Sequence, residues 1–174
     1  MATGSTADPV ALDNHIELLS GVALFELVER DALRLMAFAA DARRLREGEH
    51  LFREGERSDG GYVVVSGSLA TTKAGSDTEM VAGRGALIGR TALFLRIKRP
   101  VSAVARERSE VLRISPTLMK RMLEEFPSAA HAIREAMADD LDDLSADLAR
   151  AHRILAAVDE PRGGAGISPD RDRE

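Results

Sequence analysis

Hydrophobic positions recur at helical spacing near both ends of the chain and in short strand-like runs in the middle. Between residues 14 and 44, an apolar stretch over 18–28 precedes a second one over 33–38, which predicts helices, with Asp31 as the N-cap of the second. Between 45 and 114, nine glycines separate short runs rich in β-forming residues. These runs are 51–52, 62–65, 69–72, 80–82, 101–105 and 111–114, with a hairpin turn at 75–77. Such close spacing favours a β sandwich or barrel over alternating βαβ units.

Helical spacing returns at Ser115, where a serine followed by Pro116 is typical of an N-cap and first turn. Pro127 ends this helix and begins the next. Apolar residues then recur every three or four positions, at Ala130, Ile133, Met137, Leu141, Leu144, Leu148, Ala151, Leu155 and Val158. A helix over 127–158 would be about 48 Å long.

This apolar stripe needs a partner, because a small domain cannot cover a helix of that length. The opposite face carries Asp139, Asp140, Asp142, Asp143, Asp147 and Arg150, which belong in water. We predict that the same helix of a second copy covers the stripe and forms a two-fold homodimer. Its interface would contain Met137, Leu141, Leu144, Leu148, Ala151 and Leu155. The alternative is that the stripe folds back on its own barrel.

Composition narrows the function classes. The chain has 174 residues, which suits one domain, and no cysteine, which excludes disulfides, thiolate metal sites and a cysteine nucleophile. Its net charge of −5 argues against binding nucleic acid through bulk charge. No apolar run approaches the roughly 20 residues of a membrane span, and the first residues do not resemble a secretion signal, so a cytoplasmic protein is expected. We expect a flexible arm over 1–13, a domain over 14–126, a dimerisation helix over 127–158 and a disordered tail over 159–174.

Four segments together resemble the cyclic nucleotide-binding domain, the sensor half of catabolite-activator and Fnr-type regulators. Residues 48–56 (GEHLFREGE) are similar to its G-E-x-[LI]-[FI]-x-x-G-[DE], and 62–69 (YVVVSGSL) to its Y-x-[VI]-x-x-G-x-[VL]. Residues 89–93 (GRTAL) stand where the family has its phosphate cassette, G-E-x-A-L, and 99–103 (RPVSA) where it has R-P-R-[ST]-A. The resemblance implies an α+β, mainly β fold: a jelly-roll β barrel flanked by N-terminal helices and a long C-terminal dimerisation helix.

The resemblance also shows what this chain lacks. Arg90 replaces the cassette carboxylate that accepts the ribose hydroxyl, and Val101 replaces the guanidinium that pairs with the cyclic phosphate, while Ser102 remains. Losing that guanidinium removes roughly 1.5–3 kcal/mol of binding, or about tenfold to a hundredfold in affinity. The candidate ligand-binding residues are Gly89, Arg90, Thr91, Ala92, Val101 and Ser102. Arg90 could return the positive charge from the opposite lip and hold an anion, or it could point toward a surface carboxylate.

Enzyme chemistry is not expected. A metal-dependent jelly-roll enzyme needs two or three converging histidines, but His50 is the only histidine in the β-rich region. No helix-turn-helix follows the heptad segment, so direct DNA binding is not expected either. We predict a stand-alone, dimeric regulatory module that needs no cofactor or membrane and does not bind ordinary cyclic AMP or cyclic GMP. The alternatives are a scaffold or regulatory partner without a ligand, and a truncated Crp/Fnr-type transcription regulator.

Overall fold

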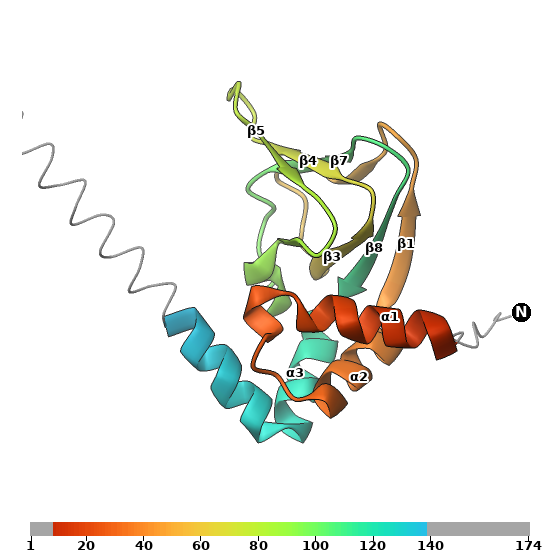
Figure 1. Cartoon of the computed structure of the whole chain (residues 1–174). Helices are drawn as coiled ribbons and strands as arrows, with labels where there is room; N and C mark the ends of the chain where they lie inside the picture. Colours follow the sequence, from red (N-terminus) through yellow and green to blue (C-terminus); the bar gives the residue numbers. More distant parts are fainter. Residues whose placement is uncertain (1–8, 139–174) are drawn as a thin grey trace, which may run out of the picture. The chain divides into compact units, whose positions relative to one another are not determined.

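Two antiparallel sheets of four strands each lie beside a group of helices (Figure 1). The structure is a computed structural model, and it describes residues 9–138. The strands are β1 (Asp41–Leu45), β2 (His50–Phe52), β3 (Gly61–Ser66), β4 (Leu69–Thr72), β5 (Glu79–Ala82), β6 (Leu87–Ile88), β7 (Ser102–Ala105) and β8 (Ser109–Ile114). Their orders are β1-β8-β3-β6 in one sheet and β2-β7-β4-β5 in the other. The predicted mainly β, jelly-roll fold is confirmed.

The two sheets share one hydrophobic core. Inward-facing residues of both sheets form a single buried cluster, which includes Leu51 and Ala103 from one sheet and Tyr62, Val64 and Val111 from the other. Successive residues of β8 point to opposite faces of the sheet. Val111 is therefore buried in this cluster, and Leu112 is buried in a second cluster that the helices form on the other face. The β3–β8 pair therefore separates the barrel interior from the helical layer.

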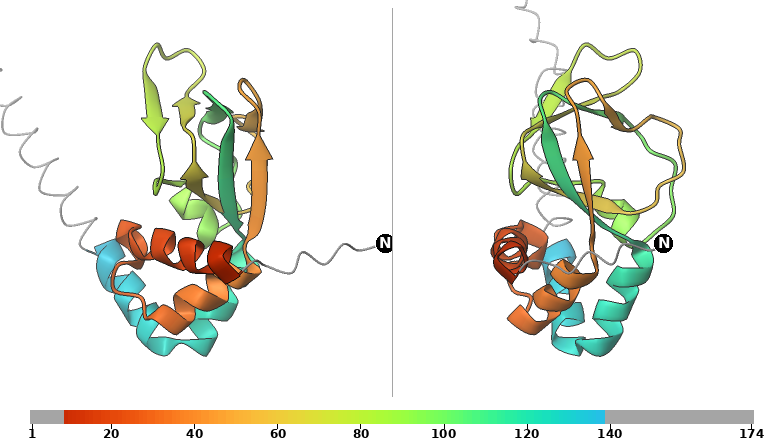
Figure 2. Two further views of the ribbon diagram at one scale, coloured as in Figure 1. Left: turned by 45° about the vertical axis from the view of Figure 1, so that its right-hand side comes forward. Right: turned by 90° about the vertical axis from the view of Figure 1, so that its right-hand side faces the viewer.

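Helices cover one end of the barrel, as the two views of Figure 2 show. They are α1 (Pro9–Ser20), the short 3-10 helix η1 (Ala23–Phe25), α2 (Arg30–Ala39) and α3 (Pro116–Glu125), followed by a helix over 127–138. Their apolar faces pack together with Val63, Leu112 and Ile114 of the sheet. The sequence explains the start of α3, because the Ser115 side chain accepts a hydrogen bond from the backbone N–H of Leu118 at 3.1 Å, as an N-cap does.

Three details differ from the sequence prediction. The first helix begins at Pro9, so the segment expected to be an arm up to residue 13 is partly helical. Residues 41–44 are not helical but form most of β1, which pairs with β8. Asp31 lies in the first turn of α2 rather than at its N-cap, which is Glu29 without a side-chain cap. The Glu29 carboxylate instead accepts a hydrogen bond from the Ser128 hydroxyl at 2.6 Å.

The helix over 127–138 carries the first residues of the predicted heptad stripe. Ile133 is buried against the helical core, whereas Met137 is 38% exposed. The remaining interface residues, Leu141, Leu144, Leu148, Ala151 and Leu155, lie outside the described residues, so the dimerisation helix stays a prediction. Within residues 9–138, no helix is long and apolar enough to span a membrane.

Candidate ligand-binding site

The segment that resembles the phosphate cassette forms a tight turn and a short helix after β6. Gly89 has left-handed backbone angles (φ 75°, ψ 44°) and precedes the 3-10 helix η2 (Arg90–Leu93). Glycine adopts this conformation without the steric cost that a side chain would add. Ala92 and Leu93 are buried, while Arg90 and Thr91 are exposed. The first half of η2 therefore faces outward, and its second half anchors it in the core.

The buried half of η2 packs on the start of β3. A Cβ atom built on Gly61 would lie 2.6 Å from Leu93 Cδ2 and 3.2 Å from the Gly89 carbonyl oxygen. Only a residue without a side chain allows this close approach. Gly61 thus lets the cassette lie directly against the central strand.

The other half of the predicted site lies at the start of β7. Val101 is half-buried and packs against the barrel core, so it contributes an apolar wall. The Ser102 hydroxyl accepts a hydrogen bond from the backbone N–H of Glu54 at 2.9 Å, which ties it to the loop after β2. The Glu54 carboxylate accepts a further bond from the backbone N–H of Ala74 at 2.7 Å. The hydroxyl of Ser102, the serine that remains from the family pattern, is therefore already hydrogen-bonded to the backbone of the protein.

A buried arginine that the sequence analysis did not select lies next to this cassette. Arg99 is only 3% exposed, and its guanidinium carbon lies 4.0 Å from the centre of the Phe52 ring and 5.4 Å from that of Tyr62. Its Nη2 donates to Asp59 Oδ1 at 3.0 Å and to the Gly60 carbonyl at 2.7 Å. Aromatic faces and a carboxylate together make burial of the charge tolerable.

Arg99 also touches the cassette directly. A Cβ atom built on Gly89 would lie 2.6 Å from Arg99 Nη1. The glycine is thus required both by its backbone angles and by the guanidinium behind it. Arg99 Nε and Nη1 are buried and have no hydrogen-bond partner among the described residues. The guanidinium is therefore only partly satisfied by the protein around it.

Asp59 connects this arginine to the other sheet. Its carboxylate accepts the Tyr62 hydroxyl at 2.7 and 2.9 Å and pairs with Arg113 of β8 at 3.4 Å, in addition to Arg99. Arg113 in turn pairs with Asp41 of β1. Two guanidiniums therefore share one carboxylate, and the single Tyr62 O–H is shared between its two oxygens.

The pKa values of the network follow from these contacts. Burial alone would raise the pKa of the Asp59 carboxyl, but the Tyr62 hydrogen bond, a backbone hydrogen bond and the charges of Arg113 and Arg99 lower it below its ordinary value. Burial, with the hydrogen bond to the negative Asp59, raises the pKa of the Tyr62 hydroxyl to about 12. At neutral pH the network therefore contains an ionised carboxylate and a neutral phenol.

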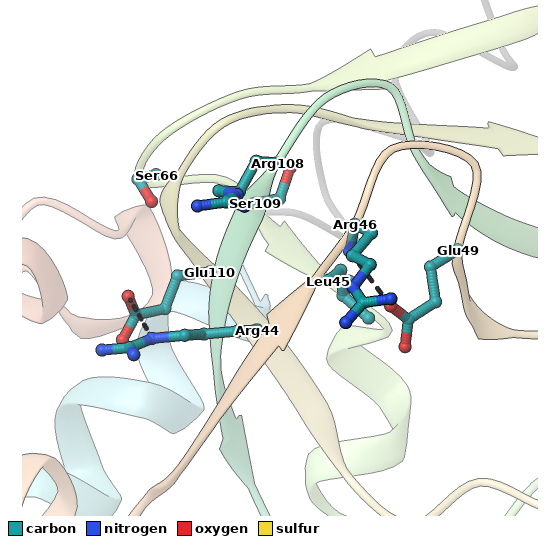
Figure 3. Close-up of a pocket in the computed structure, with 8 residues that line it drawn as sticks. All are labelled: Arg44, Leu45, Arg46, Glu49, Ser66, Arg108, Ser109 and Glu110. Atoms are coloured by element: carbon teal, nitrogen blue, oxygen red, sulfur yellow. Dashed lines mark hydrogen bonds and ion pairs between the residues drawn. The ribbon is translucent and has the colours of Figure 1, made fainter.

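Two surface hollows lie apart from the six candidate ligand-binding residues. The first, where β1 meets β8, is shown in Figure 3. It is lined by Arg44, Leu45, Arg46, Glu49, Ser66, Arg108, Ser109 and Glu110. Its charges are partly paired, since Arg44 lies 3.5 Å from Glu110 and Glu49 accepts the backbone N–H of Arg46 at 3.0 Å. The second lies between η2 and α3, with Leu93, Met119 and Leu123 in its lining.

The structure brings the cassette residues 89–92 together in one turn, but neither of these hollows is lined by both Arg90 and Val101. Residues 9–138 contain no group of three or more metal-ligating side chains. His50 is instead hydrogen-bonded to Arg53 at 2.9 Å. The missed arginine was visible in the sequence as the first residue of RPVSA, but nothing in that pattern showed that it is buried.

Comparison with known proteins identifies the relatives of this chain. A family model described as "Cyclic nucleotide-binding domain" matches residues 42–126. A cyclic nucleotide-binding-like protein from Brucella abortus is 38% identical, with a TM-score of 0.58, over 64% of this chain and 99% of that one. The N-terminal domain of a transcriptional regulator from Streptomyces coelicolor is 25% identical, with a TM-score of 0.68, over 73% of this chain and 94% of that one.

One curated enzyme also contains a similar segment. Lysophospholipase nte1 from Aspergillus terreus is 23% identical over 111 residues, which are 62% of this chain. The match spans only 7% of that protein's length. The similarity therefore concerns one segment of a much larger protein.

Proposed function

Because this chain belongs to the cyclic nucleotide-binding domain family, we propose that it is a regulatory module whose altered cassette does not bind ordinary cyclic AMP or cyclic GMP. The chain is a cyclic nucleotide-binding-like domain in sequence and fold. The observation that carries the proposal is the charge arrangement at the cassette. A cation, Arg90, stands at the position of the sugar-binding carboxylate, and an apolar Val101 at that of the phosphate-binding guanidinium.

The two exchanges act on different parts of a cyclic nucleotide. Arg90 offers only hydrogen-bond donors, so it cannot accept the ribose hydroxyl proton. Val101 offers neither charge nor hydrogen bond and packs into the barrel core. Arg99 does not simply replace the missing guanidinium, because its Nη2 is already bonded to Asp59 and Gly60 behind the cassette. A bound cyclic nucleotide would lose contacts at both ends of its sugar–phosphate unit.

Calorimetry tests this part of the proposal. Cyclic AMP or cyclic GMP titrated into the purified protein at micromolar concentration should release no saturable heat. The double variant Arg90→Glu, Val101→Arg provides a matched comparison, since it restores both side chains of the family pattern. A tight, stoichiometric site for either nucleotide in the unaltered protein would refute the proposal.

The same proposal includes a homodimer formed through the heptad segment. Met137 is the first residue of the predicted interface, and it is partly exposed, which supports the proposal that another surface covers it. The double variant Leu141→Asp, Leu148→Asp places two charges on the stripe and should shift the protein to a monomer in light scattering. Asp142→Asn with Asp143→Asn alters the acidic face instead and should leave the mass unchanged. An unchanged mass in the leucine variant would remove the dimer from the proposal.

A further inference from the structure

We propose that the groove between η2 and α3 binds an acidic amphipathic helix of a partner protein. The groove has a volume of about 530 Å³ and lies where α3 contacts η2. None of its lining residues is among the six candidate ligand-binding residues. The proposal therefore goes beyond the proposed function, and it does not depend on what the cassette binds.

The floor of the groove is apolar. Leu93, at the end of η2, and Met119 of α3 are buried in the helical core. Phe94 and Leu123 are half-buried and pack against the same core. Leu95, which lies next to Phe94 in the sequence, is 61% exposed and adds a further apolar side chain to this surface. Apolar surface of this kind marks a place where another protein surface can dock.

One face of α3 forms a long wall of the groove. Met119, Lys120 and Leu123 line it at three, four and seven positions after Pro116, which lines it as well. Residues at this spacing share one face of a helix, and the face extends here over about two turns, or roughly 10 Å. A partner helix that lies alongside α3 can place its own apolar residues between this wall and Phe94. The groove therefore has the form that a helix requires.

The charged residues that line the groove are both cations. Arg96 follows η2 on one wall and Lys120 stands on the α3 wall, and no carboxylate is part of the lining. Arg96 has no ion pair with another described residue. Lys120 pairs with Glu124 at 3.6 Å, but the two side chains are 76% and 66% exposed, so this pair contributes little and leaves Lys120 available. The groove is thus locally positive on a chain whose net charge is −5.

These features together select the occupant. An apolar helix stripe bordered by carboxylates can cover the floor and pair with both cations at once. A nucleic acid would gain only two phosphate contacts and would leave the apolar floor uncovered. A wholly apolar helix would place Arg96 and Lys120 beside a surface that offers them no acceptor. Charge complementarity therefore favours an acidic amphipathic helix.

Methionine methyl signals in nuclear magnetic resonance test the proposal on the full-length protein. A synthetic helical peptide of about 15 residues, with leucines three and four positions apart and glutamates beside them, should shift the methyl signal of Met119 saturably. The signal of Met36, which is buried in the same helical core but does not line the groove, should stay in place. Two matched peptides, with lysine for every glutamate or serine for every leucine, should not bind. A Met119 signal that stays in place with the acidic peptide at millimolar concentration, or that shifts equally with either matched peptide, would overturn the inference.

Two charge reversals on α3 separate the groove from general attraction of acidic peptides. Lys120→Glu reverses a lining cation and should weaken binding of the acidic peptide by about tenfold or more. Arg121→Glu changes the net charge by the same amount at the next position, which is outside the groove, and should leave the affinity nearly unchanged. Both side chains are exposed, so both variants should fold, which circular dichroism checks. Equal weakening in the two variants would contradict a defined groove.

Two further measurements identify a different occupant. A Met119 signal that shifts with protein concentration alone would assign the groove to a second copy of this chain. Sedimentation with phosphatidylserine vesicles that is lost in Lys120→Glu would assign it to an anionic membrane. Either result would overturn the proposal of an acidic partner helix.

Discussion

Replacing Gly89 with alanine tests the contact between the cassette and Arg99. The matched control is Gly48→Ala, because both glycines have left-handed φ angles, 75° and 77°, but a Cβ at Gly48 meets nothing within 4 Å. Backbone strain should therefore cost both variants a similar amount, about 1–2 kcal/mol of the free energy of unfolding. Any additional loss in Gly89→Ala measures the collision with the guanidinium.

The size of that additional loss follows from the distance. The new methyl group would lie 2.6 Å from Arg99 Nη1, whereas ordinary contact begins at 3.4 Å, so the guanidinium must move. Movement disturbs the charge-assisted hydrogen bonds of Nη2, which are worth about 1.5–3 kcal/mol each. We expect Gly89→Ala to lose about 1–3 kcal/mol more than Gly48→Ala, or roughly 2–12 °C in Tm for a chain of this size.

Urea unfolding followed by far-ultraviolet circular dichroism suits this measurement, because the chain has no tryptophan. Repeating the comparison in an Arg99→Met background should reduce the additional loss, since the shorter, uncharged side chain can yield to the methyl group. Equal destabilisation by Gly89→Ala and Gly48→Ala would refute the contact.

Two further predictions concern the network and the caps. Tyr62 is the only tyrosine, so tyrosinate absorbance reports it alone, and the hydroxyl should ionise near pH 12 in the folded protein. Because folding raises this pKa above its ordinary value of 10.0, the neutral hydroxyl stabilises the folded state fully below pH 10, and this contribution is lost as the pH rises towards 12. Tyr62→Phe should remove this pH-dependent loss of stability. Ionisation of Tyr62 near pH 10 in the folded protein would contradict the prediction. Ser115→Ala removes the side-chain cap of α3 and should lower the free energy of unfolding in urea by about 1 kcal/mol. Ser115→Asp retains a hydrogen-bond acceptor and should lower it by less. Equal losses in the two variants would argue against the cap.

Most strands were predictable from the sequence because they carry short runs of β-forming residues, with glycines in several of the turns between them. β1 was missed for a physical reason. Its sequence, DARRL, is mostly polar and exposed because the strand lies at the edge of its sheet, so no apolar alternation marks it and the preceding helical pattern was extended through it. β6 has only two residues, which is too short for any periodicity.

The position of the cassette segment was predictable from the sequence, but the burial of Arg99 beside it was not. Gly89 is the first residue of the GRTAL segment that resembles the cassette, and it has left-handed backbone angles. Arg99 was overlooked because arginine is normally exposed, and only the fold brings Phe52, Asp59 and Gly89 around it from three separate segments. Burial of a charged residue depends on such distant contacts, which a linear pattern does not record.

The single carboxylate of Asp59 has a mechanical consequence for the barrel. Arg99 belongs to the segment that leads into β7 of one sheet, and Arg113 to β8 of the other, so both sheets are fastened to the same side chain. Arg113 also lies two residues before Ser115, the N-cap of α3. If one sheet slid across the other, or if Arg99 shifted away from Gly89, the ion pairs of Asp59 with Arg99 and Arg113 would be strained. That strain would reach the segment just before α3.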